Sequence, residues 1–158
     1  MQPEQLLIRR AGPADAPTLV AFNCALAHES EGRRLDPAVV SRGVARVLSN
    51  PALGVYYLAE RGGTVVGQLM VTFELSDWRD GVFWWIQSVY VAPAARRLGV
   101  YRRLHEAVAA DARRSGDACG VRLYVDADNT RAQAVYERLG MKRTAYYLYE
   151  TDWSQAGG

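Results

Sequence analysis

The fold of this chain is decided by one stretch of sequence, Val89-Tyr90-Val91-Ala92-Pro93-Ala94-Ala95-Arg96-Arg97-Leu98-Gly99-Val100-Tyr101-Arg102-Arg103-Leu104. Pro93 ends an apolar segment typical of a strand, and Gly99 stands where helical spacing begins. The first amides of a helix have no internal acceptor, and the helix dipole adds partial positive charge there. The stretch therefore predicts a strand, a short loop and a helix start that can hold a phosphate.

The charges around this helix start favour an anion site. Acids are usually preferred in a first turn, yet no acid lies between Asp80 and Glu106. Four arginines flank the helix start instead, at Arg96, Arg97, Arg102 and Arg103. Four cations at the positive end of a helix repel one another unless an anion neutralises them. The alternative is a solvated arginine face, because the chain has a single lysine among its 19 basic residues.

Strands and helices are predicted on both sides of this stretch. The predicted strands are Leu6–Arg10, Val55–Glu60, Thr64–Glu74, Val82–Ala92, Val121–Asp126 and Arg143–Glu150. The predicted helices begin near Asp15, at Asp36-Pro37, at about Gly99 (ending at Ser115) and at Asn129 (closed by Gly140). Strands clustered in hairpins and then joined through helices indicate a mixed sheet covered by helices, of the α/β or α+β class.

Composition limits the alternatives. The chain has 158 residues, a net charge of +2 and 49% hydrophobic residues, which indicates one domain over residues 1–153 with a short flexible tail at 154–158. This charge does not favour a nucleic-acid partner. No apolar run spans a bilayer and no signal-peptide core is present, so a soluble, cytoplasmic protein without a membrane partner is expected. Cys24 and Cys119 are isolated, so we expect no disulfide and no metal.

Two motifs resemble those of the GCN5-related N-acetyltransferase (GNAT) superfamily. Arg96 and Gly99 match its motif A, Gln/Arg-x-x-Gly-x-Gly/Ala, although Tyr101 stands at the last position. The segment from Leu123 to Met141 is similar to motif B, in which a strand leads to an Asn and then to a helix with Ala and Tyr, with Met141 in place of the common Phe. The two motifs stand in the family's order and at its usual separation.

The resemblance implies a mixed, mostly antiparallel sheet of about six to seven strands with about four helices, in which Val82–Ala92 and Val121–Asp126 splay apart. Acetyl-CoA would lie in that cleft, with its pantetheine arm on the strand and its pyrophosphate on the helix start. Asn129 would contact the pantetheine arm, or serve as a plain helix cap. The cofactor-binding residues that the resemblance implies are Val89, Tyr90, Val91, Arg96, Arg97, Leu98, Gly99, Val100, Tyr101, Arg102, Asn129, Ala132 and Tyr136.

Tyr136 is the expected catalytic acid. By residue pattern alone it is a core-facing side chain, but the family's tyrosine at this position faces the thioester sulfur. A phenol with a pKa near ~10 can protonate a departing thiolate with a pKa near ~8.5.

The general base is less defined, because the central strand offers Trp84, Trp85, Gln87 and Ser88 but no carboxylate. We expect Glu29, in a loop after the first helix, to take the amine proton, with four other acids as alternatives: Glu31, Glu74, Asp77 and Asp80. His28 is a further alternative. Each acid alone could be a solvated surface group, but together they suggest a cationic acceptor. His105 is interpreted as structural, and the group of Trp78, Trp84 and Trp85 as core and sheet-surface residues; the alternative is that one or two of these rings line an acceptor pocket.

The sequence therefore predicts an N-acetyltransferase that transfers an acetyl group from acetyl-CoA to a small-molecule or protein amine by direct attack. A non-catalytic acyl-CoA-binding module of the same fold is the alternative, and O-acetylation is open. A homodimer is expected, with Tyr146-Tyr147-Leu148-Tyr149 as a candidate interface.

Overall fold

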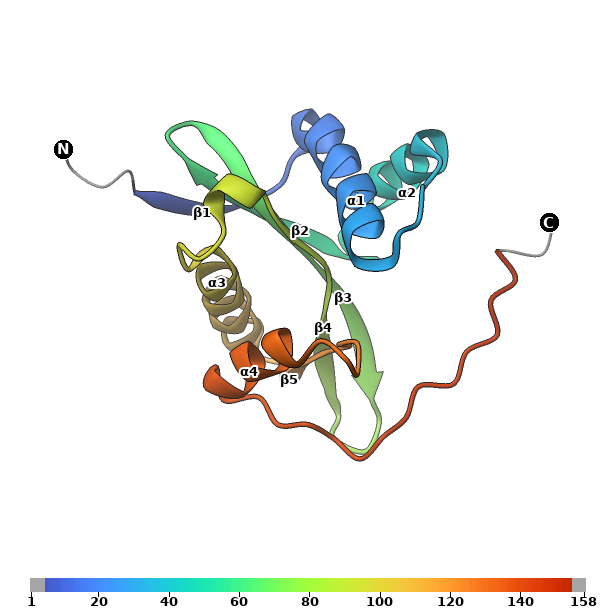
Figure 1. Ribbon diagram of the computed structural model, residues 1–158. Helices are drawn as coiled ribbons and strands as arrows, with labels where there is room; N and C mark the ends of the chain where they lie inside the picture. Colours follow the sequence, from blue (N-terminus) through green and yellow to red (C-terminus); the bar gives the residue numbers. More distant parts are fainter. Residues whose placement is uncertain (1–4, 155–158) are drawn as a thin grey trace. The chain divides into compact units, whose positions relative to one another are not determined.

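The computed structural model describes residues 5–154 (Figure 1). The chain divides into two compact units, Met1–Tyr124 and Val125–Gly158. The first unit contains five strands and three helices: β1 (Leu6–Arg10), α1 (Ala16–Glu31), α2 (Pro37–Ser49), β2 (Val55–Arg61), β3 (Thr64–Ser76), β4 (Gly81–Val91), α3 (Val100–Ser115) and β5 (Ala118–Leu123), with 3₁₀ turns at Pro13–Asp15 and Pro93–Ala95. The second unit contains α4 (Thr130–Arg138).

The first unit is built on one mixed sheet with the strand order β1-β2-β3-β4-β5. The first four strands pair antiparallel with their neighbours in sequence, and β5 pairs parallel with β4. A parallel neighbour requires a crossover connection, and α3 provides it. The predicted class, α/β or α+β with a mixed, mostly antiparallel sheet, is confirmed.

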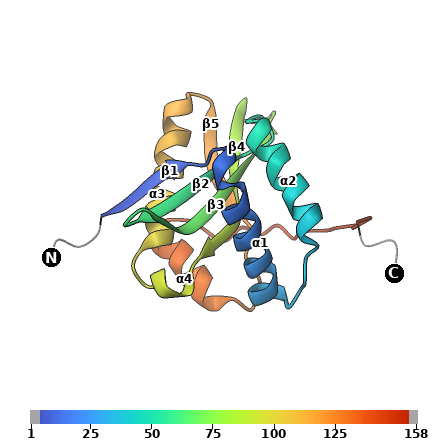
Figure 2. The same ribbon diagram turned by 90° about the horizontal axis from the view of Figure 1, so that it is seen from above.

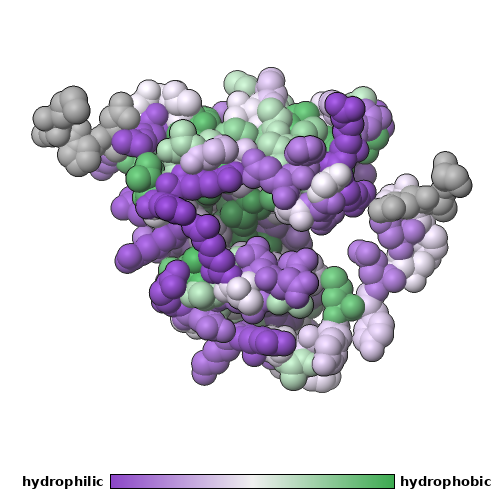
Figure 3. Space-filling view, in the orientation of Figure 1, coloured by the Kyte–Doolittle hydropathy of each residue, from purple (hydrophilic) through white to green (hydrophobic). Residues whose placement is uncertain are grey.

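Helices cover both faces of this sheet, with α3 on one face and α1 and α2 on the other (Figure 2). Successive residues of a strand point to opposite faces. Thus Tyr57 and Ala59 join the core under α3, while Tyr56 and Leu58 join the core under α1 and α2. On the surface, hydrophilic side chains cover most of the face seen in Figure 3. No helix of the described residues is long and apolar enough to cross a membrane.

The neighbouring strands β4 and β5 part near the middle of β4. Their ladder runs from Val82–Ala118 to Ile86–Leu123 and ends there, whereas β4 continues to Val91 with a partner in β3. The separation implied by the resemblance is therefore present in the strand pairing. It leaves one side of β4 beyond Ile86 without a neighbouring strand in the first unit.

The helix ends that were predicted from capping residues are found in the structure. The Asp36 carboxylate accepts a hydrogen bond from the Ala38 amide (2.9 Å), and Asn129 Oδ1 accepts one from the Ala132 amide (3.1 Å), as predicted for both caps. Gly140 follows α4 with a φ of +86°. These ends were predictable because a cap satisfies amides within a few residues of itself.

The predictions for the last two strands need correction. β5 is Ala118–Leu123, not Val121–Asp126, because Gly120 pairs with Phe83 and leaves room for its ring; a Cβ at Gly120 would lie 2.7 Å from Phe83 Cε1. The strand predicted at Arg143–Glu150 is wrong, since residues 142–153 form neither strand nor helix. The described sheet therefore has five strands rather than six or seven. Aromatic residues favour strands, but a strand forms only with a partner to pair its backbone.

The expected flexible tail at 154–158 lies, beyond Ser154, outside the described residues.

Candidate active site

A β-bulge interrupts β4 just beyond the point where β5 leaves it. The register with β3 shifts between Gln68 and Met70, which face Tyr90 and Gln87, so Ser88 and Val89 together face one residue of β3. Ser88 has a φ of +48°, in the left-handed region that a serine rarely adopts. Bulges re-aim backbone groups next to active sites. The main-chain groups of residues 87–91 thus lie beside an open strand side, where an extended ligand can bind.

The start of α3 follows β4 in the chain after a short loop. The turn before it contains Arg97 with a φ of +66° and Gly99 with a φ of +75°. Gly99 is the N-cap residue; no described side chain caps the helix, and its first turn has no acid. A Cβ built on Gly99 would meet nothing within 4 Å, so the backbone of Gly99 itself is not crowded by other atoms. Because no described side chain caps the helix, its first amides keep the donors on which the predicted phosphate site depends.

Arg96 links this loop to β4 and to α1. Its Nε donates to the main-chain oxygen of Val91 (3.0 Å), and its Nη2 lies 2.5 Å from Glu29 Oε2. The hydroxyl of Tyr90 donates to the other carboxylate oxygen of Glu29 (3.3 Å). Burial and the neighbouring Glu29 carboxylate raise the pKa of Tyr90. The candidate base and the candidate phosphate ligand are thus joined in one ion pair.

Glu29 and Glu31 lie in the last turns of α1, not in a loop after it. The helix extends further than predicted because its end is set by Gly32, which has a φ of +62°. Glu31 pairs with Arg33 (3.5 Å).

Arg102, in the first turn of α3, pairs with Glu106 one turn further on (2.8 Å). Two of the four arginines at the helix start, Arg96 and Arg102, are thus partly neutralised by carboxylates of the chain itself.

The five predicted acids do not form one cluster. Glu29 contacts Tyr90 near one end of β4, whereas Asp77 and Asp80 lie in the turn that precedes its other end. Glu74 is engaged by Arg122 (3.0 Å). Because these acids are dispersed, they do not jointly support a cationic acceptor; the contact with the bulge end of β4 is made by Glu29.

Trp85 lies in a cluster of aromatic side chains on β4 and just after β5, of which only the tryptophan was predicted as a sheet-surface residue. The ring of Trp85 lies 4.6 Å from that of Tyr124, and the guanidinium of Arg122 lies 3.5 Å above the Phe83 ring. Phe83 and Trp85 are two positions apart in β4 and therefore lie on one face of the strand. This spacing alone could have predicted that the two rings share a face. Trp84 belongs to the core under α3, as expected, whereas Trp78 is 87% exposed.

The second unit holds Asn129 and Tyr136. Asn129 caps α4, and the side-chain amide of Gln133 donates to the main-chain oxygens of Asp126 and Ala127 (3.0 Å each), which fixes the turn before the helix. Burial raises the pKa of Tyr136, so its phenol stays protonated at neutral pH. Tyr136 therefore has the protonation state that a general acid needs.

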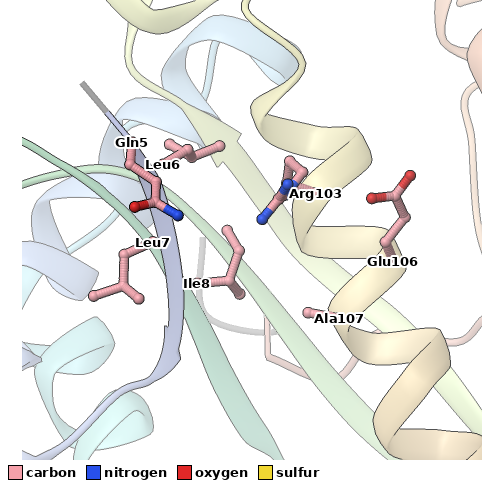
Figure 4. A pocket seen from close by; sticks show the side chains of 7 residues that line it. All are labelled: Gln5, Leu6, Leu7, Ile8, Arg103, Glu106 and Ala107. Atoms are coloured by element: carbon pink, nitrogen blue, oxygen red, sulfur yellow. The ribbon is translucent and has the colours of Figure 1, made fainter. Parts of the chain in front are cut away.

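A pocket of about 580 Å³ lies elsewhere, between β1 and α3 (Figure 4). Leu6, Leu7 and Ile8 line one side, and Arg103, Glu106 and Ala107 line the other. It contains none of the residues predicted to bind the cofactor. Among the described residues, no group of three or more His, Cys, Asp or Glu side chains could hold a metal ion.

Comparison with known proteins shows the family to which this fold belongs. The model of the Acetyltransferase (GNAT) family matches residues 25–141, and the chain belongs to that family. The crystal structure of a possible acetyltransferase from Clostridium difficile 630 is 40% identical over 94% of this chain and 98% of that chain, with a TM-score of 0.87. No curated protein matches the chain.

Two further structures share the fold at lower identity. A predicted acetyltransferase from Clostridium acetobutylicum, solved with acetyl-CoA, is 18% identical over 93% of this chain and 96% of that chain, with a TM-score of 0.77. AAC(6')-Iy, solved with the bisubstrate analogue CoA-S-monomethyl-acetylneamine, is 16% identical over 94% of this chain and 98% of that chain, with a TM-score of 0.75.

Proposed function

We propose that this protein is an acetyl-CoA-dependent N-acetyltransferase acting on a primary amine. The observation that carries the proposal is the conjunction, within one unit, of an open side of β4 and the uncapped start of α3. An extended pantetheine arm can pair with residues 87–91, while a diphosphate can accept hydrogen bonds from the backbone amides after Gly99. Membership of the GNAT family supports this cofactor.

The proposed reaction is direct transfer. The neutral amine attacks the thioester carbonyl, the new C–N bond forms, and the C–S bond breaks. A backbone amide of the bulged segment donates to the oxyanion, which stabilises charge that develops only in the transition state. Tyr136 gives its proton to the departing thiolate, and a base removes the proton of the attacking amine.

Glu29 is the proposed base, and its position suggests an order of events. Its carboxylate is held by Arg96. A diphosphate bound at the helix start would compete for the same guanidinium and release Glu29. Cofactor binding would then prepare the base before the amine arrives.

A non-catalytic acyl-CoA-binding module remains the second candidate. Two observations favour it: β4 carries no carboxylate, and Glu29, the proposed base, is already engaged by Arg96. The two candidates share the cofactor site and differ in turnover.

Calorimetric titration of CoA tests the cofactor site, and α3 offers a matched pair of variants. Gly99 and Gly116 cap the two ends of the helix with φ values of +75° and +84°, and a Cβ meets nothing within 4 Å at either. Gly99→Ala and Gly116→Ala should therefore lose similar stability, about 1 kcal/mol each. Only Gly99→Ala should weaken CoA binding. Equal CoA affinity for both variants, or no heat with the wild type, would overturn the proposal.

Turnover is tested by thiol release from acetyl-CoA against a panel of amines. The panel should contain polyamines, amino acids, a lysine peptide and neamine, the last because of the ligand bound to AAC(6')-Iy. Release above the acceptor-free rate identifies the enzyme; CoA binding without release from any acceptor favours the binding module.

A further inference from the structure

A buried chain of hydrogen bonds leads from α1 to the bulge of β4. Gln68 on β3 is fully buried, and its Nε2 donates both to Asn23 Oδ1 on α1 and to the main-chain oxygen of Ser88, each at 3.1 Å. Asn23 in turn donates from Nδ2 to the hydroxyl of Tyr56 (3.3 Å). One glutamine therefore ties the irregular part of β4 to the helix that covers it.

The chemistry of the partner fixes the orientation of this glutamine. A main-chain carbonyl can only accept a hydrogen bond, so the amide nitrogen of Gln68 must face Ser88. Both of its hydrogens are then used. Gln68 Oε1 is left buried without a hydrogen-bond partner among the described residues.

An unsatisfied buried oxygen lowers stability, and an apolar side chain of the same length would avoid that cost. Stability alone therefore does not explain a glutamine here. The side chain supplies a hydrogen-bond donor at the segment of β4 where the bulge interrupts the regular register with β3, at Ser88 and Val89.

Holding the Ser88 carbonyl also orients the next amide. The peptide between Ser88 and Val89 is trans, and its C=O and N–H point in opposite directions. With the Ser88 oxygen turned to Gln68, the Val89 N–H points away from Gln68. This amide belongs to the stretch of β4 that has lost β5 as a neighbour.

We infer that Gln68, oriented by Asn23, is a positioning residue that aims the Val89 amide at the thioester carbonyl of bound acetyl-CoA. The inference rests on the proposed function. Gln68 acts through the backbone and touches no substrate atom in this role. Ser88, at a φ of +48°, is held in its strained conformation by the same bond.

The test uses [1-¹³C]acetyl-CoA and needs no acceptor. A hydrogen bond from Val89 polarises the thioester carbonyl, so its ¹³C resonance should move downfield when acetyl-CoA binds the wild type. In Gln68→Met, CoA should bind with unchanged affinity, while the downfield shift should be largely lost. The acceptor-free hydrolysis of acetyl-CoA should fall about tenfold, less than the 10²–10³ of a deleted oxyanion donor.

Tyr57→Phe is the control, because it loses a buried hydrogen bond on the opposite face of the sheet, to Asp111. It should keep both the shift and the hydrolysis rate of the wild type. If Gln68→Met does not fold, Asn23→Ala replaces it, since it removes the group that orients the Gln68 amide.

The outcomes are separable. Failure of the wild type to bind CoA overturns the proposed function and the inference together. A wild type that binds acetyl-CoA with no downfield shift, or a folded variant that keeps the shift and rate of the wild type, overturns the inference alone.

Discussion

The carboxylate of Glu29 in α1 and the guanidinium of Arg96 before α3 form an ion pair with 2.5 Å between Oε2 and Nη2. The two residues are 67 positions apart in the chain. Their contact joins the helix on the proposed acceptor side to the loop on the proposed cofactor side. It lets the charge state of one side influence the other.

Glu29→Gln is predicted to tighten CoA binding, because it removes a negative charge that competes with the diphosphate for Arg96. Both partners are substantially exposed, so the gain should not exceed about fivefold at low salt, the equivalent of a surface ion pair of up to about 1 kcal/mol. Calorimetry at two salt concentrations measures it. Weaker CoA binding would instead mean that Glu29 holds Arg96 in its binding position.

The same variant tests the base. If Glu29 accepts the amine proton, kcat should fall by about 10² in this variant. Glu31→Gln, two residues further on in α1, is the matched control and should keep the kcat of the wild type. Equal kcat for both variants would remove Glu29 from the mechanism.

Tyr136→Phe is predicted to lower kcat by at least about tenfold while the affinity for acetyl-CoA is unchanged, because only the proton donor is removed. Burial raises the pKa of Tyr136, so the wild type should keep this acid protonated through neutral pH. Tyr147→Phe makes the same change in the same unit at a residue that is 87% exposed. The measurement is kcat of the wild type and of Tyr136→Phe on the slowest amine. A kcat of the variant equal to that of the wild type would contradict the acid role.

Asp111 is predicted to anchor α3 on the sheet. Its Oδ2 accepts from the buried Tyr57 hydroxyl (2.7 Å) and from Arg10 (3.1 Å), and its Oδ1 accepts from Arg114. Asp111→Asn should lower the free energy of unfolding by about 1–3 kcal/mol at pH 7, because the hydrogen bonds from Tyr57 and Arg10 then lose the charge of the carboxylate acceptor. Urea denaturation of Asp111→Asn, Tyr57→Phe and the double variant measures the coupling; strictly additive effects would contradict it.

The pH dependence of this effect has a defined sign. Burial alone would raise the pKa of Asp111, but the hydrogen bonds from Tyr57 and Arg10 leave it lowered. A lowered folded-state pKa stabilises the protein fully above the unfolded value of about 3.9 and loses that contribution as the pH falls through the folded value. The difference between wild type and Asp111→Asn should therefore shrink below about pH 4.

His105 is predicted to make the protein less stable in mild acid. It is buried on α3, its Nε2 has no hydrogen-bond partner among the described residues, and burial lowers its pKa. Nearby Glu106 and Arg113 act in opposite directions on it. Since the unfolded chain takes up a proton first, the free energy of unfolding should fall as the pH drops below about 6.5 and level off below the folded pKa.

His105→Leu should remove that slope, and His28→Asn, at an exposed position, should retain it. Chemical denaturation at several pH values between 5 and 8 makes the comparison. An identical slope in wild type and His105→Leu would show that another group is responsible.

Local patterns predicted most of the elements that frame the site. The apolar run of β4, the helical stripe of α3 and the caps Asp36 and Asn129 each act within a few residues, so one stretch of sequence contains the whole signal. The start of β5 was missed because Ala118, Cys119 and Gly120 are small and carry no strand pattern along the chain. The reason for Gly120 lies on the neighbouring strand, where the ring of Phe83 occupies the space of a Cβ.

By itself the sequence determined the open helix start, since Gly99, the arginines and the missing first-turn acid are all local. The partners of those groups were decided only by the tertiary structure. Glu29 meets Arg96, and Gln68 meets Ser88, across 67 and 20 positions of the chain. A hydrogen bond between distant residues exists only after the sheet and its covering helix have packed, and no spacing along the chain encodes it.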